Sequence, residues 1–520
     1  MLNPEIIDEY MPKWYILIPV AVFIYILSVT LIKDAIYTRR MGCKNPPYAH
    51  IVKFSGVFAL MRLLKAKSED RLTEFLMDVF AHYPNNTFFL RLAGVLKVVF
   101  TVDPDNMKAV LATQFNDFSL GRRHAHFKPL LGDGVFTLDG EAWKFTRGML
   151  RPQFAREQIG HVQLLEPHVQ VLAKHIELYQ GETFDLQKLF FQFTVDTSTE
   201  LLFGESVHSL YDEHLGLPCP NNIPERDGFA EAFGISQTIL ASRAYSQIFH
   251  HLFNSAQFRH CNKKVQALAQ YYVQLALELT PEELEVKSKG NYTFLYELVK
   301  KTRSPKMLQD QLLNIMVAGR DTTAGLLSFT MFELARNPEV WAKLKDEIYT
   351  KFGGGDDSRI EEITFESLKK CDYLKSILQE ALRMYPAVPI NFRVANKDTT
   401  LPRGGGTDGN SPIFIPKGST VAYSVYVTHR REEFYGKDAD KFRPERWDDL
   451  KKLGWAYLPF NGGPRICLGQ QFALTEASYV IARLAQMFPN IKSMDPSYPP
   501  KQHLHLTASL QPGTQIQMWK

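Results

Sequence analysis

The alternation of apolar and polar residues along the chain predicts one membrane-length segment followed by a much longer, mostly helical region. Residues 14–32 (WYILIPVAVFIYILSVTLI) contain no charged side chain. A helix over this run rises about 1.5 Å per residue and spans roughly 28 Å, close to the hydrocarbon thickness of a bilayer. Acidic rather than basic residues precede the run, which argues against a cleaved signal peptide. We therefore expect an uncleaved transmembrane anchor over 14–32.

The charges around this segment predict its orientation. Four basic residues follow it between positions 33 and 44, so the positive-inside rule places the rest of the chain in the cytosol and residues 1–13 in the lumen. Residues 33–60, which contain Asn45-Pro46-Pro47, are expected to form a linker. The glycosylation patterns that begin at Asn85 and Asn291 should then remain unmodified.

Beyond the linker the apolar pattern is mainly helical. Residues 87–102 instead alternate and are rich in β-branched side chains, which predicts a pair of strands. Strand patterns return only at about 390–425 and near the C-terminus. We expect a mainly α fold with a small β portion, in one large domain over residues 61–520. The triglycine runs that start at Gly353 and Gly404 lack the spacing of phosphate-binding loops and are interpreted as surface loops.

One long helix is predicted to carry a polar pair at its middle. Ser304 and Pro305 form a helix start, and the apolar period continues to about Arg336. Asp321 and Thr322 interrupt this apolar pattern. Thr322 could be a core threonine bonded to a carbonyl one turn earlier, or the two side chains could relay protons beside a local distortion of the helix.

The stretch from Phe460 to Gly469 holds a cysteine, Cys467, between glycines and directly before a helix predicted from Gln470 to about Met487. The positive end of a helix dipole favours a thiolate, the form that ligates metals and attacks electrophiles. The residues themselves leave both roles open. The chain has five scattered cysteines without a C-x-x-C pair, which excludes zinc ribbons, dithiol redox motifs and a disulfide framework. A net charge of only +4 lacks the basic excess of nucleic-acid-binding proteins.

Four motifs in fixed order carry a family resemblance: Ala-Gly-x-Asp-Thr-Thr from Ala318, Glu-x-x-Arg from Glu380, Pro-Glu-Arg-Trp from Pro444, and Phe-x-x-Gly-x-Arg-x-Cys-x-Gly from Phe460. Together they resemble the cytochrome P-450 superfamily of haem-thiolate monooxygenases. Residues 121–140, 143–147 and 401–412 look like the yeast branch that hydroxylates n-alkanes and fatty acids.

The resemblance implies the cytochrome P-450 fold, a haem b cofactor and a set of site residues. Cys467 would be the axial thiolate of the haem iron, and Thr322 with Asp321 would deliver protons while dioxygen is activated. The side chain of Arg320 is expected to point away from the haem. The remaining residues implied are the haem contacts Trp143, Arg147, Arg393, Phe460, Gly463, Arg465 and Gly469, the structural network Glu380, Arg383 and Arg446, and the substrate contacts Phe127, Leu131, Phe136, Phe233, Ala318, Val388, Phe392 and Leu510, each of which could equally be plain core.

The function implied is hydroxylation of long-chain n-alkanes or fatty acids, at or near the chain terminus, in the endoplasmic reticulum membrane. The chain has no Rossmann fingerprint or flavin domain, so NADPH would supply electrons through a separate flavoprotein reductase. The alternatives are oxygenation of another lipophilic substrate (a sterol or xenobiotic), a haem-thiolate isomerase or dehydratase that consumes peroxides, and a haem-based sensor. The intact Asp321-Thr322 pair argues against the isomerase, and an open distal pocket with a proton relay argues against the sensor.

Overall fold

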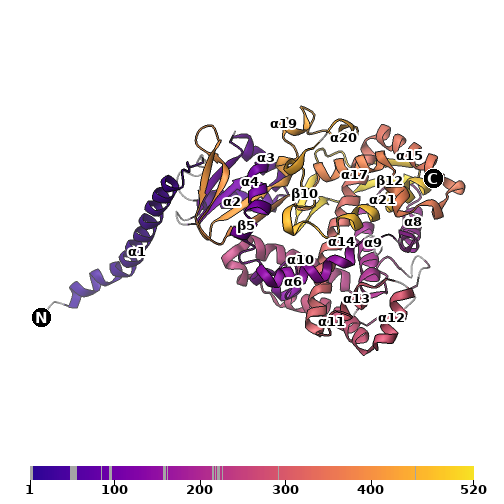
Figure 1. The fold of residues 1–520 in the computed structure, drawn as a ribbon, viewed down its shortest axis with the longest axis horizontal. Helices are drawn as coiled ribbons and strands as arrows, with labels where there is room; N and C mark the ends of the chain where they lie inside the picture. The colour runs from indigo at the N-terminus through magenta and orange to yellow at the C-terminus, as the bar shows by residue number, and fades with distance from the viewer. Residues whose placement is uncertain are drawn as a thin grey trace. The chain divides into compact units, whose positions relative to one another are not determined.

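The fold was analysed in a computed structural model, which confirms a mainly helical chain with small sheets (Figure 1). It forms two compact units. The smaller comprises residues 1–68, 74–121 and 390–424, and the larger comprises residues 69–73, 122–389 and 425–520. The residues described are 4–46, 56–83, 85–92, 96–155, 160, 162–212, 216, 218–219, 223–224, 226–290, 292–450 and 452–520.

The predicted apolar segment lies within a longer helix, α1 (Pro4–Arg40). Its stretch Tyr15–Arg40 is long and apolar enough to cross a membrane, and none of its most apolar window is buried against the protein. The end of α1 contacts the smaller unit. The rings of Tyr37 and Phe414 stack with centroids 5.7 Å apart, and the Lys44 N–H donates to the Pro412 carbonyl at 2.9 Å.

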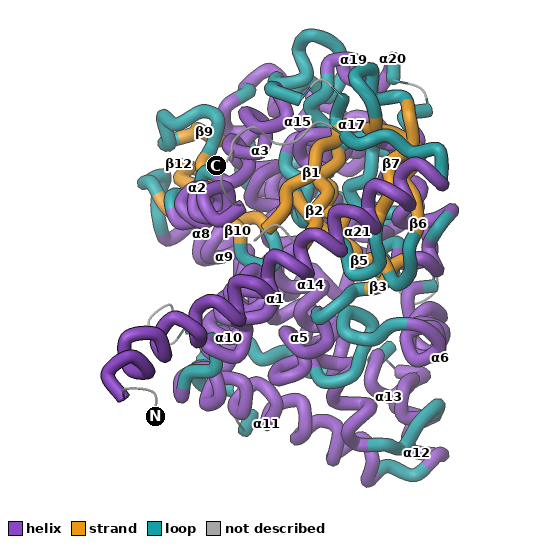
Figure 2. The backbone as a smooth tube through the Cα atoms, turned by 90° about the vertical axis from the view of Figure 1, so that its left-hand side faces the viewer, coloured by secondary structure: helices purple, strands orange, loops and turns teal. Residues whose placement is uncertain are grey.

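Sheet in the smaller unit is built mainly from the two regions where strands were predicted. A five-stranded sheet has the order β1-β2-β8-β5-β3, and β1 and β2 pair antiparallel as the alternation indicates. Figure 2 shows β1 beside β2. A separate hairpin is formed by β6 and β7. The elements of this unit are α2 (Gly56–Ser68), most of α3 (Leu72–Ala81), β1 (Thr87–Leu92), β2 (Leu96–Thr101), α4 (Pro104–Lys108), β3 (Phe118–Ser119), β5 (Ile390–Ala395), β6 (Thr399–Gly405), β7 (Ser411–Ile415) and β8 (Thr420–Ser424).

The second triglycine run does not form the loop expected of it. Gly404 and Gly405 belong to β6, and both are buried. A Cβ atom at Gly404 would lie 2.6 Å from Cβ of Thr87, and the φ angle of +109° also favours glycine. These glycines therefore allow close packing of the hairpin within the smaller unit.

Helices dominate the larger unit, with a three-stranded sheet (β4-β12-β9) and a β10–β11 hairpin. The helices are α5 (Arg123–Leu131), α6 (Gly140–Leu150), α8 (Glu166–Leu178), α9 (Leu186–Phe203), α10 (Phe229–Ser246), α11 (Ala256–Glu278), α12 (Pro281–Gly290), α13 (Phe294–Val299), α14 (Pro305–Arg336), α15 (Pro338–Phe352), α16 (Phe365–Leu368), α17 (Asp372–Met384), α18 (Val425–Thr428), α19 (Glu432–Tyr435), α20 (Arg446–Asp449) and α21 (Gln470–Met487). The strands are β4 (Phe184–Asp185), β9 (Asn490–Ser493), β10 (Lys501–Leu504), β11 (Ala508–Gln511) and β12 (Gln515–Trp519).

The long helix α14 has the predicted bounds. The Ser304 hydroxyl accepts the N–H of Met307, and Pro305 occupies the first turn. The helix packs against α9, α11, α17 and α21, which explains why most of its residues are buried. Between the two ends of the helix, residues 317–322 are the exception and are only partly buried. The predicted backbone distortion does not interrupt the helix, which is continuous over all 32 residues.

Candidate haem-thiolate site

The cysteine segment folds back on itself before α21 begins. Gly463, at φ +68°, opens a short 3₁₀ turn that ends at Arg465. The Cys467 N–H then donates to the Phe460 carbonyl at 3.0 Å. Gly469 caps α21, so the cysteine lies just before the helix, as the sequence predicts. The glycines permit this reversal because their backbone angles are sterically free.

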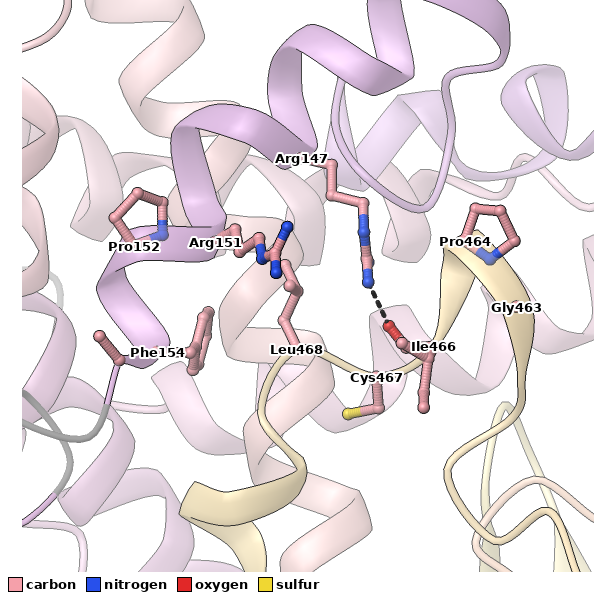
Figure 3. A pocket seen from close by; sticks show the side chains of 10 residues that line it. Arg147, Arg151, Pro152, Phe154, Gly463, Pro464, Ile466, Cys467 and Leu468 are labelled. Atoms are coloured by element: carbon pink, nitrogen blue, oxygen red, sulfur yellow. Dashed lines mark hydrogen bonds between the residues drawn. The ribbon is translucent and has the colours of Figure 1, made fainter. Parts of the chain in front are cut away.

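Cys467 lies on the wall of a cavity of about 660 Å³ (Figure 3). Cys467 borders this cavity, whereas Cys43, Cys261 and Cys371 are buried in the protein and are not among the lining residues. The Arg147 guanidinium reaches the same wall and donates to the Ile466 carbonyl at 2.7 Å. The residues lining the cavity are Arg147, Arg151, Pro152, Phe154, Ala155, Gly463, Pro464, Ile466, Cys467 and Leu468.

The electrostatics around the sulfur differ from the expectation of a readily formed thiolate. Burial raises the pKa of the Cys467 thiol, and this outweighs the lowering by the Gly469 N–H and the Arg147 guanidinium. A coordinated metal, in contrast, deprotonates a thiol outright. The site therefore fits a metal ligand better than a free nucleophile, and one open cysteine beside cationic side chains fits an anionic metallo-cofactor that takes a single protein ligand.

Three of the predicted haem contacts gather beside this segment. Arg465 lies over the Trp143 ring, with 4.3 Å from its guanidinium carbon to the ring centroid, and Arg147 lies over the same ring at 5.8 Å. Arg465 also donates to the Asp139 carboxylate at 2.7 Å. Arg393 belongs to the smaller unit, where it is buried and donates to the carbonyl of the preceding residue at 2.8 Å.

The predicted polar pair lies on the partly buried turn of α14. The Thr322 hydroxyl donates to the Ala318 carbonyl at 2.6 Å, which is the backbone-bonded threonine considered above. Two lone pairs of its oxygen remain as acceptors. Burial raises the pKa of Asp321, and the neighbouring Arg320 partly offsets this shift. A carboxyl with a raised pKa can hold and exchange protons more readily near neutral pH.

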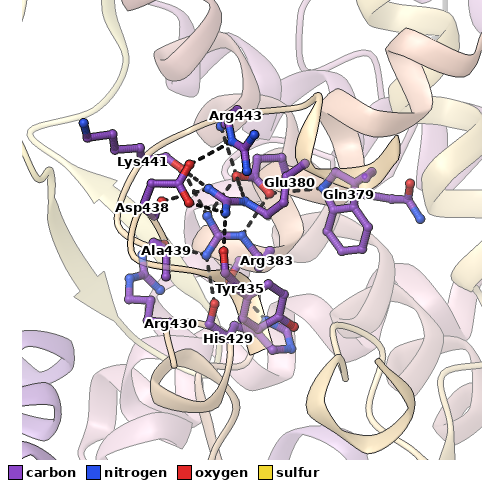
Figure 4. A network of polar contacts seen from close by, with 12 residues as sticks. Gln379, Glu380, Arg383, His429, Arg430, Tyr435, Asp438, Ala439, Lys441 and Arg443 are labelled. Carbon is purple, nitrogen blue, oxygen red and sulfur yellow. Dashed lines mark hydrogen bonds and ion pairs between the residues drawn. The ribbon is translucent and has the colours of Figure 1, made fainter. Parts of the chain in front are cut away.

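Glu380, Arg383 and Arg446 form one buried network, of which Figure 4 shows Glu380 and Arg383 with the loop around them. Arg383 donates to both carboxylate oxygens of Glu380, at 2.9 and 2.8 Å. Arg446 donates to the same carboxylate at 3.2 Å, and the Arg443 N–H adds a bond of 3.0 Å. The bidentate geometry compensates for the desolvation of these charges. The Glu380–Arg383 ion pair is therefore a buried interaction and not one on the protein surface.

The network has other members that the sequence analysis does not identify. Trp447 donates from Nε1 to Glu380 at 3.1 Å, and Asp438 accepts from Arg446 at 2.8 Å. His429 accepts the Leu458 N–H at Nε2, 2.8 Å away, while its own carbonyl accepts from Arg383. Trp447 is marked by its place in the Pro-Glu-Arg-Trp motif, but Asp438 and His429 carry no spacing signal.

The predicted substrate contacts lie in different surroundings. Leu131 and Phe233 are buried in one apolar cluster of the larger unit, with Phe127 and Phe136 packed against it. Leu510 is also fully buried on β11. The remaining three are Ala318 on the partly buried turn of α14, Val388 at 37% exposure, and Phe392 in the smaller unit.

Comparison with known proteins decides the family. The family model described as "Cytochrome P450" matches residues 53–518. The chain belongs to the cytochrome P450 family. Similar relatives include cytochrome P450 52A3-A of Candida maltosa (64% identical) and cytochrome P450 52A3-B of the same yeast (63%), each covering 99% of both chains. Cytochrome P450 52A6 of Candida tropicalis is 63% identical, with both chains covered completely.

Family membership confirms the expected cofactor and chemistry. Cytochromes P450 are monooxygenases that bind haem through a cysteine thiolate and take dioxygen and electrons from a redox partner. This cytochrome P450 is accordingly a haem-thiolate monooxygenase. The resemblance to yeast enzymes is also supported, because the relatives named above are yeast proteins of the 52A group.

Proposed function

We propose that this cytochrome P450 hydroxylates long-chain n-alkanes or fatty acids at or near the chain terminus. The observation that carries the proposal is its end-to-end similarity to 52A proteins of Candida yeasts, together with the stretches 121–140 and 401–412 that look like the alkane-hydroxylating branch. The apolar character of the predicted substrate contacts suits an aliphatic chain.

Cys467 is the proposed ligand of the haem iron. It is the cysteine of the family motif and it faces the cavity. Trp143, Arg147 and Arg465 would hold the haem propionates, since buried anions need cationic or hydrogen-bonding partners. When bound, the haem supplies the iron centre that activates dioxygen. The Arg465 guanidinium, here bonded to the Asp139 carboxylate and the Leu138 carbonyl, would exchange part of these bonds for bonds to a propionate.

Asp321 and Thr322 are the proposed route for protons. The Asp321 carboxylate can accept a proton from water and pass it on, while the Thr322 hydroxyl can accept one hydrogen bond as it donates another. Delivery through Thr322 requires its bond to the Ala318 carbonyl to exchange for a bond toward the oxygen substrate. Rotation of the Thr322 side chain would make this exchange while the backbone of α14 stays in place.

The N-terminal helix supports a membrane location. We propose a single-pass anchor at the endoplasmic reticulum, with residues 1–13 in the lumen, a linker over 33–60 and a catalytic domain over 61–520 in the cytosol. The supporting observations are the exposed apolar face of α1 and the basic residues that follow the span. A reductase that uses NADPH and carries flavin is the proposed electron donor.

A spectral titration of the ferric protein tests the substrate class. Hexadecane, palmitic acid and ergosterol are added separately, and conversion of low-spin to high-spin haem is recorded. We expect a saturable shift with hexadecane or palmitic acid, because a bound chain expels water from the iron. A shift with ergosterol alone would contradict the proposed substrate class and leave the family assignment intact.

Replacement of the cysteine tests the ligand. Cys467→Ala and Cys467→His should abolish the thiolate-type Soret band of the reduced carbon monoxide complex, together with oxygenase activity. Cys371→Ala is the matched control, because Cys371 is buried away from the cavity and should leave the band unchanged. Retention of the thiolate-type band in Cys467→Ala would refute the assignment.

A further inference from the structure

The middle turn of α14 carries a guanidinium in an unusual setting. Arg320 precedes the proposed catalytic pair, and only 11% of its side chain is exposed. Its guanidinium carbon lies 5.7 Å from the ring centroid of Phe191 on α9 and 5.3 Å from that of Phe233 on α10. Two rings from separate helices thus clamp the cation, and such contacts strengthen when desolvated.

The clamped arginine has one charged neighbour among the interactions that the structure shows. Its Nε lies 3.4 Å from a carboxylate oxygen of Asp321 and makes no hydrogen bond. Arg320 is likewise the one charged group in the described chain that shifts the pKa of Asp321, lowering it against the effect of burial. The groups packed against Arg320 from α9 and α10 are uncharged aromatic rings.

We propose that Arg320 is a positioning residue for proton delivery. Clamped by Phe191 and Phe233, it holds the Asp321 carboxylate in its ionised form. This form can take a proton from water and release it through the Thr322 hydroxyl, with no electron moving at either group. The inference rests on the proposed role of Asp321. The adjacent carboxylate also supplies a counter-charge for a guanidinium that is buried among aromatic rings.

The test compares Arg320→Met with the wild type in the full-length holoenzyme, supplied with reductase, NADPH and hexadecane. The readout is hydroxylated product per NADPH consumed. Without the guanidinium the pKa of Asp321 rises, so the acid remains protonated to higher pH. We expect coupling at pH 7 to fall by up to about fivefold, because a carboxylate that is at least half ionised in the wild type loses no more than that for a rise of one pKa unit, and to recover as the pH is raised. Arg320→Lys should recover part of the coupling, because it keeps the charge but loses the planar stacking.

Two further variants make the result specific. Arg336→Met removes another arginine of α14 that lies on a ring, 4.4 Å from the Phe332 centroid, and should leave coupling unchanged. In an Asp321→Asn background, Arg320→Met should cause no additional loss, since both changes act on one carboxylate. Haem content is normalised by the carbon monoxide spectrum.

The outcomes separate the inference from the proposed function. If Asp321→Asn leaves coupling intact, the proposed role of Asp321 and the inference both fail. If Asp321→Asn lowers coupling and Arg320→Met does not, the inference alone fails. If Arg320→Met weakens the binding of palmitic acid while hexadecane binding and coupling are unchanged, Arg320 anchors a substrate carboxylate and the inference is overturned.

Discussion

The Thr322 hydroxyl is bonded to a helix carbonyl, yet the proposed chemistry needs it to face dioxygen. Thr322→Ala should therefore lower product per NADPH by roughly ten- to a hundredfold. This is at or below the lower end of a general acid–base contribution, because water can replace the hydroxyl. Hydrogen peroxide should rise correspondingly. The measurement is product and peroxide formed per NADPH consumed.

The neighbour of Thr322 provides the control for this prediction. Thr323 is buried at 1% exposure, and Thr323→Ala removes the same hydroxyl one position along α14. It should leave coupling near that of the wild type. Equal losses in the two variants would show that α14 tolerates no threonine deletion here, and would contradict a special role for Thr322.

The buried His429 should make the fold less stable in acid. Burial lowers its pKa to about 3, from about 6.5 in an unfolded chain, and Nε2 must stay unprotonated to accept the Leu458 N–H. Between these values only the unfolded state binds the proton. Stability should therefore fall as the pH drops below about 6.5, by up to about 1.4 kcal/mol per pH unit.

The variant His429→Gln isolates this contribution, because Gln can still accept the Leu458 N–H but does not titrate. Its free energy of unfolding, measured with urea in detergent micelles from pH 7 to 5, should depend less on pH than that of the wild type. Glu333 and Glu476, whose pKa burial raises to about 7, act in the opposite sense in both proteins and cancel in the comparison. Parallel curves would refute the prediction.

Side chains with a motif could be assigned from the sequence, and those without one could not. Cys467 is recognisable because glycines and an arginine surround it at fixed spacing. His429 is a lone histidine whose role depends on Arg383 and Leu458, which are brought beside it only by the tertiary fold. The raised pKa of Cys467 was likewise missed, because burial overrides the helix end that the sequence shows.

The contact between α17 and the loop before α20 depends on one carboxylate. Glu380→Ala leaves the buried Arg383 and Arg446 without their shared partner, which should cost about 3–5 kcal/mol and prevent recovery of stable haem-loaded protein. The measurement is haem content and the carbon monoxide spectrum after purification.

An exposed ion pair nearby provides the comparison. Lys343 pairs with Glu445 at 2.5 Å, but its side chain is 57% exposed. Lys343→Ala should have little effect on stability and retain the haem, because exposed ion pairs are screened by solvent. Stable, fully loaded Glu380→Ala protein would show that the network does not hold the haem fold.

Helices and strands were predictable where local signals agree with burial. The bounds of α14 follow from Ser304 and Pro305 at its start, and the β1–β2 pair follows from alternation. The prediction of a surface loop at Gly404 was wrong because it relied on the frequency of glycine in loops. Here it permits close packing against Thr87, a long-range contact that no local pattern encodes.

The membrane orientation of the molecule can be tested by whether its asparagine acceptor sites are glycosylated. The pattern at Asn85 lies in the smaller unit, where the Asn85 side chain donates to the Gly406 carbonyl at 2.9 Å, whereas Asn291 is outside the described residues. If the domain faces the cytosol, glycosidase treatment of the native protein should cause no mass shift. A shift would reverse the proposed orientation.

The end of α1 is fastened to the smaller unit rather than joined to it by a slack connection. Besides the Tyr37–Phe414 stack, Lys33 lies 3.9 Å from the Asp398 carboxylate. A fastened helix restricts the tilt of this unit relative to the membrane plane. A constant side of the smaller unit would then face the lipid, and an insertion after Met41 should impair capture of membrane-dissolved substrate more than turnover of a soluble one.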